Sequence, residues 1–158
     1  MKALSAFTFA AAVLVVSPEA SSRQPSPSCV SVGGTIAASI IETESGQAVI
    51  GSVTGTLRGA VRGIVEALEP QPDGSLRLDV LDHFVTEEGH VLETRDDVHL
   101  VPVPGREGVF HQLATYEVVS GTGKFERARG SFTGHGEADI GRGQVTVRYE
   151  GELCGVRR

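Results

Sequence analysis

The 158-residue sequence contains no tryptophan, and aromatic residues make up only 5% of it. Aliphatic side chains must therefore supply most of a hydrophobic core. Basic residues are also scarce: 14 Lys and Arg stand against 20 Asp and Glu, which leaves a formal net charge of −6. A nucleic-acid partner requires a basic surface that neutralises phosphates, and anionic lipid attracts basic segments. The composition therefore argues against both partners.

The sequence also lacks the motifs of common catalytic and cofactor sites. It has no nucleophile elbow, no phosphate-binding loop and no dinucleotide fingerprint. The cysteines have no C-x-x-C spacing, and no histidine pair has the H-x-H or H-E-x-x-H spacing of a metal site. We therefore predict no metal and no cofactor, and we interpret most acids and histidines of the middle third as solvated charges. These are Asp79, His83, His90, Asp96, Asp97, His99 and His111.

Only one long hydrophobic run is present, and it lies at the N-terminus. Lys2 precedes the apolar residues 3–16, and small residues follow them. This arrangement is typical of a secretory signal peptide, and the run is short for a transmembrane span. We predict a signal peptide over residues 1–22, a flexible linker over 23–28 and a secreted or extracytoplasmic (periplasmic or extracellular) domain over 29–158. After signal cleavage, no segment is predicted to lie in a membrane.

Glycine is abundant, with twenty residues, and it separates short runs in which apolar and polar residues alternate. Residues 130–140 and 144–153 show this alternation on either side of the turn Gly141-Arg142-Gly143. A period of two indicates strands with one wet face, and a short glycine turn between two of them indicates an antiparallel hairpin. About eight such runs follow one another along the chain, which predicts an all-β barrel or sandwich.

One segment, residues 56–68, is compatible with two structures. Leu57, Ile64 and their apolar neighbours fall at helical spacing. Gly59 and Gly63 count against a helix, because each destabilises one by about 1 kcal/mol relative to alanine. The same residues alternate as a strand would require, and we favour the strand.

Cys29 and Cys154 are the only cysteines, and they lie near the two ends of the predicted domain. In an exported protein, an even pair of cysteines more often forms a disulfide than a functional site. A closed barrel brings its first and last strands together. We therefore predict a disulfide between Cys29 and Cys154 that closes this seam.

A glycine-rich motif near the C-terminus carries a family resemblance. Gly121-Thr122-Gly123-Lys124-Phe125, followed by Ala128-Arg129-Gly130, resembles the segment between two late strands in the allene oxide cyclase/dirigent barrel superfamily. The likeness is greatest to small secreted bacterial proteins with an allene-oxide-cyclase-like barrel, although Ser120 replaces the first glycine of their pattern. The resemblance implies a single antiparallel barrel of eight strands. The matching segment is structural and carries over no catalytic residue.

Five residues are candidates for a site in such a barrel. Asp82 shares a strand face with Phe84 and other apolar residues, where a carboxyl would have a raised pKa unless paired and could act as a general acid or base. Tyr149 could direct its hydroxyl into a cavity, and Phe84 could contact a ligand there. Arg58 and Arg62 could oppose Asp82 or an anionic ligand. The alternatives are a bulge or barrel-mouth position for Asp82, a satisfied buried hydroxyl for Tyr149 and surface positions for the arginines.

These observations support two classes of function. The first is a non-enzymatic protein that binds a small apolar ligand or serves as a structural extracytoplasmic module. The second, which the resemblance implies, is a cyclase or isomerase that confines a small hydrophobic substrate in the barrel lumen. Fold alone does not decide between them. A solidly packed interior would favour the structural module, and an open apolar pocket of several hundred Å³ with one or two polar groups would favour a binder or an enzyme. A polar residue such as Asp82 or Tyr149 that faces the pocket would favour the enzyme.

Overall fold

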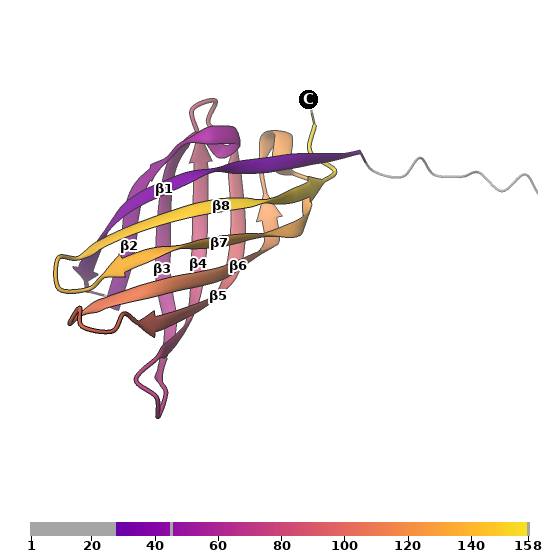
Figure 1. Cartoon of the computed structure of the whole chain (residues 1–158). Coiled ribbons are helices and arrows are strands. Elements are labelled where there is room, and N and C mark those ends of the chain that lie inside the picture. The colour runs from indigo at the N-terminus through magenta and orange to yellow at the C-terminus, as the bar shows by residue number, and fades with distance from the viewer. Residues whose placement is uncertain (1–27, 45, 158) are drawn as a thin grey trace, which may run out of the picture.

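The computed structural model describes residues 28–44 and 46–157 as eight strands and two short 3-10 helices (Figure 1). The strands form one closed barrel in chain order, with antiparallel neighbours throughout and β8 returning to β1. The predicted eight-stranded antiparallel β-barrel is therefore confirmed. The elements are β1 (Cys29–Thr43), β2 (Gly46–Val53), η1 (Gly55–Leu57), β3 (Gly59–Pro70), β4 (Leu76–Thr86), β5 (Val91–Pro102), β6 (Val109–Gly121), η2 (Gly123–Phe125), β7 (Arg129–Asp139) and β8 (Gln144–Cys154).

The predicted signal peptide over residues 1–22 and the linker over 23–28 lie outside the described residues, except for Ser28. Within residues 28–44 and 46–157, no helix is long and apolar enough to span a membrane.

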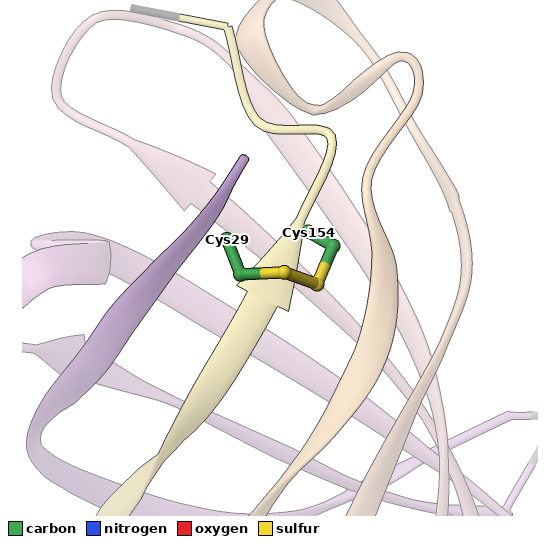
Figure 2. Close-up of a disulfide and its surroundings, with 2 residues drawn as sticks. All are labelled: Cys29 and Cys154. Carbon is green, nitrogen blue, oxygen red and sulfur yellow. A yellow bond between two sulfur atoms is a disulfide. The ribbon is translucent and has the colours of Figure 1, made fainter. Parts of the chain in front are cut away.

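The seam between β1 and β8 closes the barrel. The two strands lie side by side along their length in Figure 1, and their ladder runs from Cys29 opposite Cys154 to Ser39 opposite Gln144. The two cysteines form a disulfide between the first residue of β1 and the last residue of β8 (Figure 2). This confirms the predicted pairing. The crosslink joins residues 125 positions apart, and in the chain-entropy model a loop of this length stabilises the fold by about 3–5 kcal/mol.

The ambiguous segment is a strand for most of its length. Its first residues belong to η1, and β3 then runs from Gly59 to Pro70 between β2 and β4. Pairing on both sides satisfies the backbone groups that a helix would have bonded internally. A register shift lies between Val65 and Ala67. The predicted C-terminal hairpin is also present, as β7 and β8.

The barrel interior differs between its two ends. At the end that carries η1 and η2, which we call the closed end, seven large side chains are no more than 2% exposed; they are Leu57, Phe84, Leu92, Phe125, Phe132, Tyr149 and Leu153. The ring of Phe132 lies 5.9 Å from that of Phe84 and 5.7 Å from that of Tyr149. At the opposite end, which we call the open end, the interior side chains are aliphatic and leave a cavity.

Candidate functional site

A cavity of about 100 Å³ occupies the part of the barrel between the open end and the aromatic cluster. Leu68 and Ile140 line it and are 45% and 41% exposed, so it communicates with solvent at the open end. Fifteen of its twenty lining residues are aliphatic, which gives it an apolar wall. These are Ile36, Ile40, Val49, Val61, Val65, Leu68, Leu76, Leu78, Val80, Val98, Leu100, Ala138, Ile140, Val145 and Val147.

The remaining lining residues supply polar groups. Gln47 lies on β2 near the open end, and four others come from three adjacent strands: Asp82 from β4, Asp96 from β5, and Gln112 and Tyr116 from β6. Gln47 is exposed, whereas the other four are buried.

Strand register places the two aspartates next to each other. Asp82 pairs with Thr94, and Asp96 pairs with Val80, so the aspartates are diagonal neighbours on the inner face of β4 and β5. Asp96 also lies opposite Tyr116 on β6. Because the three strands are consecutive, the two carboxyl groups and the tyrosine form one polar patch on an otherwise aliphatic wall. We call these three residues the carboxyl patch.

Burial changes the protonation of both acids. Asp82 is 8% exposed, and burial raises its pKa to about 6, although interaction with Asp96 and the charge of His83 act in the opposite direction. Asp96 is 1% exposed, and burial, reinforced by repulsion from Asp82, raises its pKa to about 10. The same two causes hold the pKa of Tyr116 well above its ordinary value. At neutral pH the patch therefore holds one carboxylate and one neutral carboxylic acid.

Asp96 is also unusual in its hydrogen bonding. No N–H or hydroxyl group of the described residues donates a hydrogen bond to either of its carboxyl oxygens, and the buried hydroxyl of Thr94 has no partner there. With Asp96 in its neutral form, its O–H can donate to the carboxylate of Asp82, and this interaction contributes to the pKa of both acids. A buried polar group without a partner costs about 1–3 kcal/mol. The carboxyl patch therefore has hydrogen-bonding capacity that the fold does not use.

Two glycines make room for the patch. Gly63 lies opposite Asp82 on β3, and a Cβ there would overlap the Oδ1 atom of Asp82. A Cβ at Gly134 on β7 would lie 2.8 Å from Cε2 of Tyr116 and 2.7 Å from Cγ1 of Val147. Both positions therefore need glycine for a steric reason, because a side chain would push the polar groups out of place.

The sequence identified only part of this patch. Asp82 faces the lumen, as its strand alternation suggested. The interpretation of Asp96 as a solvated charge is wrong, because Asp96 is 1% exposed and lines the cavity. Its neighbours Arg95 and Asp97 are exposed charges that made this stretch of β5 look solvated. The alternation of Leu92, Thr94, Asp96, Val98 and Leu100 was the signal that would have found it.

The other candidates lie away from the cavity. The hydroxyl of Tyr149 donates to the Thr54 carbonyl at 2.8 Å and accepts from the Leu57 N–H at 3.1 Å. Phe84 is fully buried in the aromatic cluster, with its ring 6.1 Å from that of Tyr116.

Both arginines are on the outside of the barrel. Arg58 forms an exposed ion pair with Glu87 at 3.4 Å. Arg62 is an exposed residue of β3, opposite His83 of β4. Neither arginine lines the cavity. In the described part of the chain, no group of three or more potential metal-ligating side chains occurs.

Comparison with known proteins assigns this chain to no family. No protein-family model matches the sequence, and no curated protein matches it. Among solved structures, the barrel is similar to a pterocarpan synthase dirigent protein, with 17% sequence identity and a TM-score of 0.36 over 94% of this chain and 100% of that one. A likeness at this level carries no argument about function. Membership of the allene oxide cyclase/dirigent superfamily therefore stays a prediction.

Proposed function

We propose that this protein is an extracytoplasmic binder of a small, mostly apolar molecule, which enters the barrel at the open end. What supports the proposal is the composition of the cavity: its wall is aliphatic, it reaches solvent, and it holds a few polar groups at one place. Its volume of about 100 Å³ is smaller than the several hundred Å³ predicted for a binding pocket. Binding sites for small molecules have this composition, in which apolar surface supplies affinity and a few polar groups fix orientation. The disulfide is compatible with an oxidising compartment.

The binding proposal is tested by filling the cavity. Val98 is 7% exposed and lines the cavity from β5, so Val98→Phe would occupy the space of a ligand. Val101 is 36% exposed on the same strand and does not line the cavity, so Val101→Phe is the matched control. We expect the wild type and Val101→Phe to bind 1-hexanol in an NMR chemical-shift titration, and Val98→Phe to bind it about tenfold more weakly or not at all. Equal binding by all three proteins would contradict the proposal.

A second candidate function is an isomerase or cyclase that acts within the same cavity. The observation that favours it is the carboxyl patch, because a carboxyl with a pKa of about 6 in an apolar site is suited to general acid–base catalysis near neutral pH. Asp82 would donate or accept the proton, and the aliphatic wall would hold the substrate. A simple test is deuterium exchange at the α-carbons of cyclohexanone in heavy water. Exchange above the buffer background that is lost in Asp82→Asn, but kept in Asp97→Asn on the outer face of β5, would support catalysis.

A further inference from the structure

The carboxyl patch contains two acidic side chains, and no basic side chain of the described residues lines the cavity to pair with them. The titratable groups that face it are Asp82 from β4, Asp96 from β5 and Tyr116 from β6, and His83 acts on Asp82 from the outer face of β4. The cavity-lining residues of β1, β2, β3, β7 and β8 include no titratable group. Within the described residues, no lysine or arginine lines the cavity. The fold therefore buries two carboxyl groups and supplies no cation to pair with them.

We propose that the ligand carries a protonated primary amine at one end and an apolar body at the other. This inference rests on the proposed binding function and adds the chemical class of the ligand. The ammonium group lies against Asp82 and Asp96, and the apolar body lies along the aliphatic wall toward the open end.

Donor and acceptor groups favour an ammonium over other head groups. An ammonium has three N–H donors and no acceptor, and the patch offers it the carboxylate of Asp82 and the unprotonated oxygen of Asp96, to which no N–H or hydroxyl of the described residues donates. Hydrogen bonds between ionised groups are stronger than neutral ones, particularly where water is excluded. A carboxylate ligand would add a third acid to this place, and an alcohol would supply one donor and no charge. The formal net charge of −6 also favours the approach of a cation over that of an anion.

The test compares three probes of equal chain length: n-hexylamine, 1-hexanol and hexanoate. In NMR titrations of the wild type at about pH 7.5, we expect hexylamine to bind about tenfold more tightly than hexanol, and hexanoate to bind more weakly than hexanol. At about pH 5, where Asp82 takes up a proton, the affinity for hexylamine should fall about tenfold, because a carboxylate with a pKa of about 6 is then mostly neutral. The affinity for hexanol should not change with pH. The amine itself stays protonated throughout, as a lysine side chain does.

The control variant is Asp82→Asn combined with Asp96→Asn, which keeps the shape of the patch and removes its charge. We expect the ratio of its affinity for hexylamine to its affinity for hexanol to be about one, whereas the same ratio is about ten in the wild type. Circular dichroism shows whether the barrel is intact, and the single variant Asp82→Asn serves if the double variant does not fold, because Asp82 carries the charge of the patch at neutral pH.

The outcomes separate the two proposals. If the wild type binds hexanol but binds hexylamine no more tightly, the amine inference is wrong and the binding function stands. If neither probe binds, the binding function itself is wrong. A preference for hexylamine that survives in the double variant would also overturn the inference, because the cation would then be recognised elsewhere.

Discussion

The two ends of this barrel treat buried polar groups in opposite ways. At the closed end, the hydroxyl of Tyr149 is fully buried and makes two hydrogen bonds to backbone groups of Thr54 and Leu57, which hold η1 against the aromatic cluster. Toward the open end, the carboxyl of Asp96 is almost as buried, and no N–H or hydroxyl group of the described structure donates a hydrogen bond to it. A satisfied buried network rigidifies a fold, whereas an unsatisfied one reduces its stability. The closed end therefore uses its buried polar group to stabilise the barrel, whereas the buried acids toward the open end reduce its stability, which is consistent with the binding function that we propose.

The largest effect is expected from truncating the aromatic cluster. Phe132 is 1% exposed and contacts Phe84, Tyr116 and Tyr149. Phe132→Ala should lower the free energy of unfolding by about 3–5 kcal/mol, because it removes apolar contacts and leaves a cavity. Urea denaturation followed by circular dichroism measures this change.

The control for Phe132 lies on the outer face of the neighbouring strand. Leu113 on β6 is 53% exposed, and Leu113→Ala should change the free energy of unfolding by about 0.5 kcal/mol or less. Similar losses for both variants would remove the distinction between the closed end and the rest of the barrel.

At the carboxyl patch we expect a smaller change in the free energy of unfolding, and of opposite sign: removing the two acids should stabilise the fold. Asp82 and Asp96 have pKa values above those of the unfolded chain, so the folded state binds more protons than the unfolded state. The contribution of these two groups to the stability of the wild type is therefore most favourable below about pH 4. It decreases as the pH rises through about 6 and beyond. The double variant Asp82→Asn, Asp96→Asn avoids this loss. At about pH 8 its free energy of unfolding should be about 1–3 kcal/mol higher than that of the wild type.

Unfolding measured at several pH values tests whether the two acids are the cause of this difference in stability. The advantage of the double variant should disappear at about pH 4, where both aspartates of the folded wild type are protonated and therefore as uncharged as the asparagines of the variant. Asp97→Asn, an exposed position on the same strand, should show no such dependence. A double variant that is less stable than the wild type at about pH 8 would mean that the patch stabilises the fold.

The smallest expected change in stability comes from removing a tyrosine hydroxyl, which can be done at both ends of the barrel. Tyr149→Phe leaves the Leu57 N–H and the Thr54 carbonyl without their partner and should cost about 1–2 kcal/mol. The Tyr116 hydroxyl faces the cavity and makes no hydrogen bond in the described structure, so Tyr116→Phe should cost less. Thermal denaturation of both variants provides the measurement. Equal losses would show that the cavity wall relies on its hydroxyl as much as the closed end does.

Much of the fold was readable from local patterns. The alternation in β7 and β8 and the glycine turn between them predicted a hairpin, because side-chain direction in a strand has a period of two regardless of what surrounds it. The pairing of Cys29 with Cys154 followed from their positions at the two ends of the domain. Gly59 and Gly63 correctly decided the ambiguous segment in favour of a strand, since a helix there would have lost stability at each glycine.

The candidate site was less readable. Asp82 stood out because its neighbours on the same face are apolar, whereas Asp96 was hidden between two charged residues. Gln112 and Tyr116 gave no sign of a site, because each is an ordinary residue of an alternating strand. Tyr149 was correctly placed on an inward face, but its partners lie 92 and 95 positions away in the chain.

By itself, the sequence determined which residues form strands and which face of each strand is apolar, because both follow from the identities of near neighbours. Only the tertiary structure decided that two acids from adjacent strands share one buried patch, and that aromatic side chains fill one end of the barrel while aliphatic ones leave space at the other. The reason is register: the pairing of β4 with β5 and of β5 with β6 sets which inward residues meet. Register depends on how all eight strands close into a barrel, which no local pattern records.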